Sequence, residues 1–188
     1  MNVNTDEQIR AIKQELRAAM NGVLSAKMRQ AGMPYKLVFG VELPRLMEIA
    51  RDFSSDRRLA QQLWHEPIRE CKMLAAMLMP TDEMSAEVAD IWVDEMLTSE
   101  IAQVCVMYLF SRTSWASEQA FHWIATDHPM RQLCGFLIIA RLLQQGAQLN
   151  ERAERELLDQ TEALLPTADL QLGRAIRAVK SKIAPPEL

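Results

Sequence analysis

The chain has 188 residues, of which 49% are hydrophobic and 6% aromatic, and its formal net charge is −4. This length and apolar content predict one domain, or two small ones, with a substantial core. The charge is uneven: residues 1–60 hold 10 basic and 7 acidic side chains, residues 61–170 hold 7 and 17, and residues 171–188 hold 4 and 1. This distribution excludes a strong general affinity for polyanions but allows a basic patch built from the two ends.

Residue usage excludes several other protein classes. Six glycines are too few for a strand-and-turn protein or an enzyme with a phosphate-binding loop. Cys71, Cys105 and Cys134 are far apart and lack metal-ligand spacing, so we expect buried free thiols in a reducing cytoplasm. The polar N-terminus does not resemble a signal peptide, and no apolar run reaches the roughly 20 residues of a membrane span. We therefore expect a cytoplasmic protein with no cofactor, no metal and no membrane partner.

The first 34 residues predict one helix. Apolar residues recur at helical spacing between Asp6 and Gln30, Thr5 or Asp6 is a suitable N-cap, and Gly32 and Pro34 end the pattern. Three shorter helices follow, each with one apolar face. Because isolated helices of this length are marginal in water, each must pack on a neighbour. Their predicted ranges are Val41–Arg51, Asp56–His65 and Pro67–Met79.

The remaining chain repeats the same pattern of short amphipathic helices. Ser114 and Asn150 are predicted N-caps, and residues 184–188 are predicted to be a flexible tail. Equivalent helices recur about every 30 to 40 residues, which is the period of HEAT-type helix pairs. The sequence thus predicts an all-α, HEAT-like solenoid of about ten helices, forming one domain over residues 1–188. The last six helices are expected at 84–96, 99–110, 114–125, 129–145, 151–165 and 168–183.

Several polar groups have both a functional and a purely structural interpretation. His65 and Glu66 are an acid–base pair or a solvated turn, and the acidic residues of 82–100 are most simply a solvated helix face. Arg174, Arg177 and Lys180 follow one another at three-residue spacing near the C-terminus. These cations could bind phosphates, or they could interact favourably with the negative end of the helix macrodipole.

The stretch from Phe39 to Ala75 resembles the AlkD-like DNA alkylation repair glycosylases. Three segments carry the resemblance: Phe39-Gly40-Val41-x-x-Pro44-x-Leu46-x-x-Ile49-Ala50, then Leu59-Ala60-x-x-Leu63-Trp64, then Arg69-Glu70-x-x-x-Leu74-Ala75. Weaker similarity extends to residue 183. The family is built of HEAT-like helix pairs, holds duplex DNA on a basic concave face and excises alkylated purines. The resemblance thus implies duplex DNA as a partner.

The resemblance also locates the family's catalytic positions, and here the sequence departs from the pattern. The family's Trp-Asp-x-x-Asp run corresponds to Ser99-Glu100-Ile101-Ala102-Gln103, in which Gln103 replaces the catalytic Asp and Ser99 replaces the Trp. A neutral amide lacks the negative charge that stabilises an oxocarbenium-like transition state. Glu100 is the remaining acid. Trp64, Trp92, Trp115 and Trp123 lie elsewhere in the pattern and are expected in the core.

The same resemblance implies a set of DNA-binding cations. The family's Gly-Trp-x-Leu-Arg run corresponds to Gly173-Arg174-Ala175-Ile176-Arg177, in which Arg174 replaces the Trp. Arg131 falls near the family's Trp-x-Arg-Arg entry to a long helix. The expected phosphate contacts are therefore Arg131, Arg174 and Arg177, with Lys72 as a further candidate.

Three functions agree with these observations. The first is a duplex-DNA-binding repair-family protein whose glycosylase activity is weakened or lost. The second is an active alkylpurine glycosylase that uses Glu100. The third is a non-enzymatic scaffold that binds a protein on its concave face, which the acidic middle segment favours.

Overall fold

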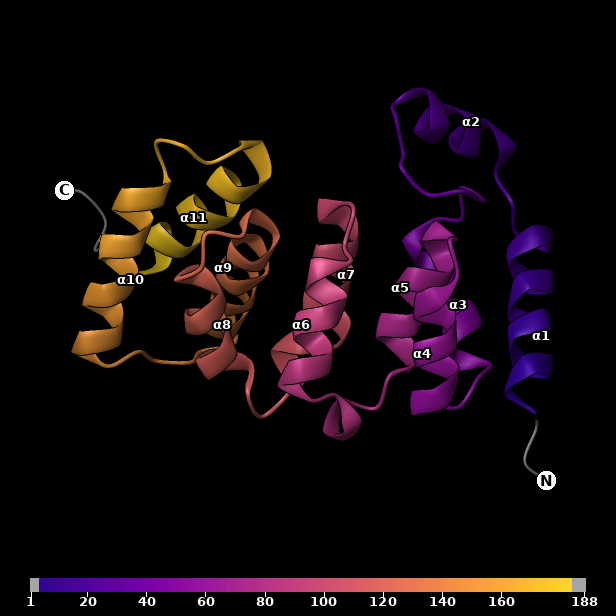
Figure 1. The fold of residues 1–188 in the computed structure, drawn as a ribbon, viewed down its shortest axis with the longest axis horizontal. Coiled ribbons are helices and arrows are strands. Elements are labelled where there is room, and N and C mark those ends of the chain that lie inside the picture. The colour runs from indigo at the N-terminus through magenta and orange to yellow at the C-terminus, as the bar shows by residue number, and fades with distance from the viewer. Residues whose placement is uncertain (1–3, 184–188) are drawn as a thin grey trace. The chain divides into compact units, whose positions relative to one another are not determined.

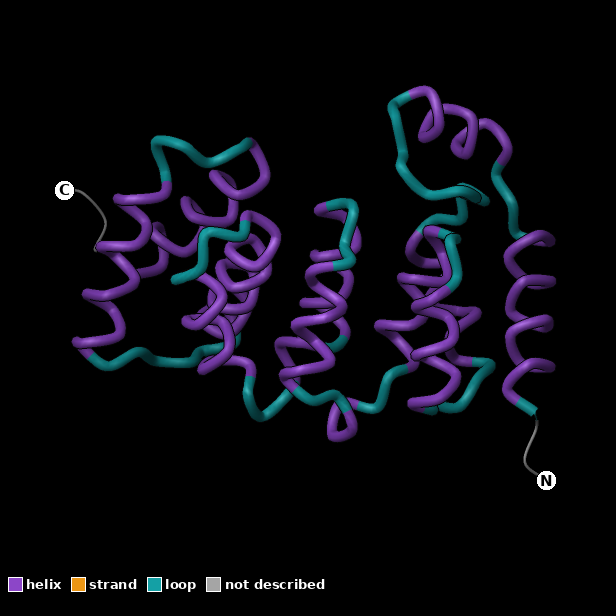
Figure 2. The backbone as a smooth tube through the Cα atoms, in the orientation of Figure 1, coloured by secondary structure: helices purple, strands orange, loops and turns teal. Residues whose placement is uncertain are grey.

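The computed structural model describes residues 4–183, and within this range all regular structure is helical apart from one isolated bridge between Leu37 and Ile68. The predicted all-α class is therefore confirmed (Figures 1 and 2). The chain divides into two compact units, residues 1–84 and 85–188, and each is described by itself. The assignment of residues 1–188 to one domain stays a prediction, and the predicted flexible tail lies outside the described residues.

Unit 1 (residues 1–84) has five α-helices and a short 3-10 turn. In its core α4 packs on α5, α5 on α3, and α1 on α4. The apolar faces predicted from helical spacing are buried, as Leu46, Leu63 and Leu74 illustrate. The bounds are α1 Thr5–Ala18, α2 Gly22–Gln30, α3 Leu43–Arg51, α4 Arg57–His65, α5 Arg69–Leu78 and η1 Thr81–Glu83.

The predicted single N-terminal helix is wrong, because the chain breaks between α1 and α2. The Asn21 side chain accepts a hydrogen bond from Leu24 N at 3.0 Å and so caps a new helix. The Asn21 backbone N–H donates to Phe39 O at 3.1 Å instead of continuing α1. The predicted cap of α1 is also displaced, since Asn4 takes that position and accepts from Asp6 N.

A buried carboxylate holds the loop that joins α2 to α3. The Glu70 oxygens accept hydrogen bonds from the backbone N–H groups of Phe39, Gly40 and Val41 at 3.1, 2.9 and 3.3 Å. Arg69 Nη1 also donates to Glu70 at 2.9 Å, and the two side chains are 3% and 0% exposed. Gly40 has φ of +73°, and a Cβ there would lie 2.6 Å from Asn21 O, so this position requires glycine. The buried charge is thus paired and hydrogen-bonded, as a charge in a core must be.

Unit 2 (residues 85–188) is organised around its longest helix, α9. Helices α6, α7, α8 and α11 all pack on α9, and α10 packs on α11. Gly135 permits the closest approach, since a Cβ there would lie 2.7 Å from Ala120 O of α8. The bounds are α6 Ala86–Asp94, α7 Ser99–Tyr108, η2 Phe110–Arg112, α8 Ala116–Ile124, α9 Pro129–Gln144, α10 Glu151–Leu164 and α11 Leu170–Ile183.

Local features of unit 2 test several further predictions. Asn150 caps α10 as expected, accepting from Ala153 N. The predicted Ser114 cap is wrong, because α8 begins one residue later with Trp115 at the N-cap position and without a side-chain cap.

Three of the four tryptophans are buried as predicted, while Trp115 is half-buried against Phe110 and Trp123. All three cysteines are buried and free.

We predict that Glu70→Ala lowers the free energy of unfolding by about 3–5 kcal/mol, because it leaves three backbone N–H groups without their acceptor and removes the carboxylate that balances the buried charge of Arg69. Urea denaturation monitored by circular dichroism measures this change. Glu48→Ala is the matched control, because Glu48 pairs with Arg45 at 2.8 Å on the exposed surface, and it should change the value by less than about 1 kcal/mol. Equal effects of the two substitutions would contradict the role assigned to Glu70.

Candidate functional site

A groove of about 310 Å³ lies where α7, α9 and α11 of unit 2 meet. Its wall is mostly apolar, and its polar groups are Gln103 from α7, Arg141 and Gln144 from α9, and Lys182 from α11. Two cations and no carboxylate line it. These groups would suit a ligand with negative charge and some apolar surface. The apolar part of the wall consists of Val106, Met107, Leu137, Ala140 and Ala178.

Arg141 is the less exposed of the two cations that line the groove. It lies in the last turn of α9, and its Nε is buried without a hydrogen-bond partner among the described residues. A buried donor left unpaired costs about 1–3 kcal/mol, and a donor on a charged group more. Because Arg141 also lines the groove, an anionic group bound there would lie close to its guanidinium. Sequence reasoning missed Arg141, although a signal existed: it is the only charged residue between Arg131 and Glu151.

Gln103, which the resemblance aligns with the family's acid, is exposed and lines this groove. Glu100 lies one turn earlier, in the first turn of α7, and does not line the groove. Thr98 caps this helix, accepting from Ile101 N at 3.4 Å. The predicted pair Glu100 and Gln103 thus shares a helix, but only Gln103 faces the cations.

Arg174 and Arg177 are exposed on α11. Arg174 is four residues before Ala178 and eight before Lys182, so helical spacing puts it on the stripe that enters the groove. The Arg177 guanidinium lies over Gly173, where a methyl group would meet its Nη2 at 3.4 Å. Of the predicted row, Arg174 and Arg177 are exposed and Lys180 is half-buried. Lys182, which does not belong to that row, lines the groove.

Arg131 is bound to two carboxylates of α6. Its Nε and Nη2 donate to the two oxygens of Asp94, both at 2.8 Å, and its Nη1 lies 3.9 Å from Asp90. Asp90 also accepts from Trp123 Nε1 at 2.6 Å and from Gln119 at 2.9 Å. The hydrogen bonds from Arg131 lower the pKa of Asp94, and the same hydrogen bonds raise the pKa of Arg131. The predicted phosphate contact of Arg131 stays a prediction that requires this pair to open.

Lys72 belongs to unit 1. Its ammonium group donates to the backbone carbonyl of Trp64 at the end of α4 and lies 4.7 Å from the centre of the Trp64 ring. It is half-buried. These contacts give Lys72 a role in joining α4 to α5, and its predicted contact with DNA stays a prediction.

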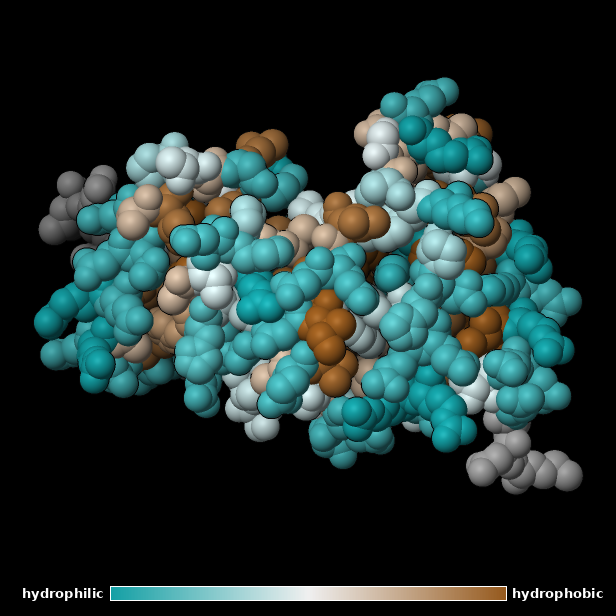
Figure 3. Space-filling model, viewed as in Figure 1, coloured by the Kyte–Doolittle hydropathy of each residue, from teal (hydrophilic) through white to brown (hydrophobic). Residues whose placement is uncertain are grey.

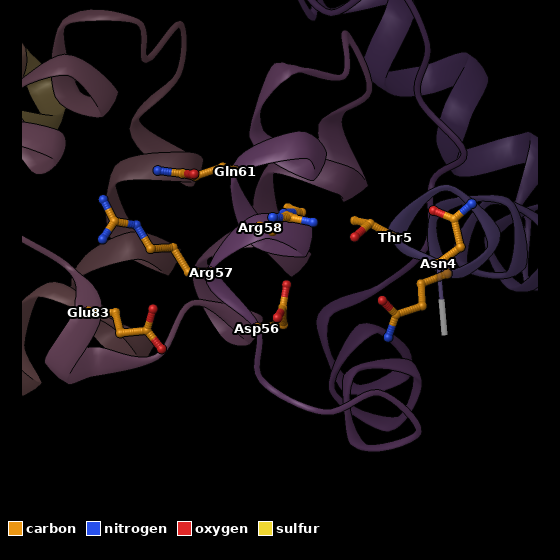
Figure 4. A pocket seen from close by; sticks show the side chains of 8 residues that line it. Asn4, Thr5, Asp56, Arg57, Arg58, Gln61 and Glu83 are labelled. Carbon is orange, nitrogen blue, oxygen red and sulfur yellow. The ribbon is translucent and has the colours of Figure 1, made fainter. Parts of the chain in front are cut away.

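A larger hollow of about 590 Å³ lies in unit 1 beside the first turns of α1 and α4 (Figure 4). Its charged lining consists of Arg57 and Arg58 with Asp56 and Glu83. Because the two signs balance, this hollow has no excess charge for an anionic partner. Over the described residues, no group of three or more His, Cys, Asp or Glu side chains is arranged to hold a metal ion, and no helix is both long and apolar enough to cross a bilayer.

The sequence pattern of the DNA alkylation repair enzyme family matches residues 12–178. The fold is similar to a solved structure described as a new family of proteins related to the HEAT-like repeat DNA glycosylases with affinity for branched DNA structures. That similarity has a TM-score of 0.81 at 18% sequence identity, over 93% of this chain and 74% of the other. It confirms the predicted HEAT-like fold. No curated protein sequence matches the chain.

We predict that the Asp94–Arg131 pair stabilises unit 2 only above the pKa of Asp94. Because folding lowers that pKa, the contribution is present above the unfolded value of about 3.9 and is lost as pH falls through the folded value. At pH 7, Asp94→Asn should reduce the free energy of unfolding by less than about 1 kcal/mol, since the pair is solvated.

Urea titrations of the wild type and of Asp94→Asn at neutral pH and at about pH 3 measure this difference, which should shrink at the lower pH. The control is Glu118→Gln, which replaces an exposed carboxylate of α8. A difference that is as large in acid as at neutral pH would contradict the assignment.

Proposed function

Because the chain belongs to the DNA alkylation repair enzyme family, we propose that it binds duplex DNA through the groove of α7, α9 and α11 without cleaving the glycosidic bond. The observation that carries this proposal is the charge of the groove, where Arg141 and Lys182 stand beside the neutral Gln103. Cations without an acid can bind a phosphate backbone, but they cannot support the positive charge that develops on a sugar.

The absent carboxylate decides against hydrolysis. Glycosidic cleavage develops positive charge on the sugar, and a preorganised negative group is the largest stabilising factor for such a transition state. Arg141 and Lys182 would instead raise the energy of a cation in the groove. No aromatic side chain lines the groove to hold a cationic methylated base by a cation–π contact. Phosphate binding requires positive charge in this groove, whereas glycosidic catalysis requires negative charge. The residues of the groove suit phosphate binding.

The phosphate backbone is the part of DNA that this groove suits. Arg141 presents a donor without a partner, and Arg groups bind phosphate through parallel hydrogen bonds. Arg174 and Arg177 extend the positive surface along α11. The solved structure with the same fold is described as having affinity for branched DNA structures, and we extend the proposal to branched DNA, whose arms carry the same backbone. A cytoplasmic location and a protein partner on the concave face stay predictions.

We expect Arg141→Met to weaken duplex binding about tenfold, because it removes one charge-assisted contact to phosphate. Fluorescence anisotropy with a labelled synthetic duplex at low salt measures the affinity. Methionine keeps the apolar stem, and Nε has no hydrogen bond to lose, so the free energy of unfolding should not fall.

Arg152→Met is the matched control, since it removes one exposed cation from α10 of the same unit. It should leave duplex affinity within about twofold of the wild type, because an exposed charge away from the site acts only through the screened field. Equal losses for both variants, or no loss for Arg141→Met, would refute the groove as the binding site.

The wild type should release no detectable 3-methyladenine or 7-methylguanine from alkylated duplex DNA, because the groove lacks the required negative charge. Chromatography of the supernatant after incubation measures the free bases. If Glu100 is a working acid, release is observed and Glu100→Gln abolishes it. That result would replace this proposal by an active glycosylase.

A further inference from the structure

The segment from Leu16 to Val41 is the most basic part of unit 1. It contains Arg17, Lys27, Arg29 and Lys36 and no acidic residue. All four cations are exposed, and no interaction of their side chains is found among the described residues. This segment contains α2, and we call residues 16–41 the α2 projection, because α2 stands apart from the other helices of its unit (Figure 1).

The α2 projection is fixed at its base. Ser25 is the only buried residue of α2, and its Oγ donates to Val38 O at 2.6 Å. The backbone of the following loop is held in turn by the Glu70 carboxylate at Phe39 and Gly40. The α2 helix is therefore presented by a defined scaffold and not by a loose loop.

Apolar side chains are exposed among these cations. Met20 is 57%, Val23 69% and Leu37 39% exposed. Hydrophilic and hydrophobic groups accordingly mix on this part of the surface (Figure 3). Large exposed apolar groups beside unpaired cations suit a partner that offers negative charge and apolar surface together. DNA offers both where its base stack is interrupted, since phosphates flank accessible base faces there.

We propose that the α2 projection is a second DNA contact, in which its cations bind phosphates and Met20 and Val23 pack against bases exposed at a nick or branch. This inference rests on the proposed DNA-binding function and names the kind of DNA. In a continuous duplex, an apolar side chain must first separate a base step, which costs free energy. At a nick or branch the stack is already interrupted, so the apolar contact favours such sites.

The cationic half of the proposal is tested by Lys27→Glu combined with Arg29→Glu. Anisotropy with a nicked synthetic duplex over a range of salt concentrations should show affinity lowered at least about tenfold at low salt, and the slope of log K against log salt reduced by about 2. The control is Arg10→Glu with Arg51→Glu, which reverses two exposed cations of the same unit. This control changes the net charge by the same amount as the Lys27→Glu, Arg29→Glu variant. An equal loss of DNA affinity in the two variants would overturn the proposal.

The apolar half is tested by Met20→Ser combined with Val23→Ser. The wild type should bind the nicked duplex more tightly than a continuous duplex of the same sequence, and this variant should lose the preference while its salt slope stays the same. Ile91→Ser with Leu97→Ser is the control, since both residues are similarly exposed in unit 2, at 56% and 58%. A preference that survives in Met20→Ser with Val23→Ser would overturn the assignment.

The outcomes separate this inference from the function on which it rests. If the wild type binds neither DNA, the proposed function fails. If Arg141→Met weakens binding and the variants of the α2 projection do not, the groove stands and the inference is overturned. A basic segment with exposed apolar groups could instead meet an anionic membrane surface. Loss of binding to phosphatidylserine vesicles, with DNA affinity unchanged, would assign the projection to lipid and overturn the inference.

Discussion

The packing of α9 is the constraint on which the candidate site depends. Four helices of unit 2 cover α9, and Gly135 lets α8 approach so closely that a methyl group would clash. A helix enclosed in this way has little room for a charged side chain. Arg141, in the last turn of α9, is half-buried and lines the groove between α7 and α11. Its Nε is buried without a hydrogen-bond partner among the described residues.

The chemistry of the groove follows from replacing one charge. With a carboxylate at position 103, the neighbouring arginine and lysine would form ion pairs with it. The carboxylate could still stabilise positive charge that develops on a sugar. With Gln103, the same two cations have no counter-ion within the groove lining. Their mutual repulsion is relieved when a phosphate enters. We therefore propose that the amide at position 103 suits the groove to the DNA backbone and not to glycosidic chemistry.

Much of the fold could be predicted from the sequence, because helical spacing of apolar residues depends only on neighbours along the chain. The three helices between Leu43 and Leu78 and the capping of α10 by Asn150 illustrate this. The break at Asn21 could not be predicted, because it depends on the backbone of Phe39, which is distant in the sequence. Glu70 was likewise noted only as part of a motif, although it organises a whole loop.

The site was predictable only in part, for the same reason. Family resemblance pointed to Gln103, which lines the groove, and to Arg174 and Arg177, which are exposed on α11. It also pointed to Arg131, which forms an ion pair with Asp94. No local sequence pattern predicts this contact. Arg141 carried a local signal, as the only charged residue between Arg131 and Glu151. Its significance depends on the packing of α9, which the sequence alone does not provide.

The most direct test of the account is the side-chain NMR resonance of Arg141 Nε–Hε during titration with duplex DNA. The account predicts that this resonance shifts progressively and saturates with the binding isotherm, because a phosphate becomes the partner of Nε, and that added salt reverses the shift. A protein that becomes saturated with DNA while the Arg141 resonance stays in place would contradict it.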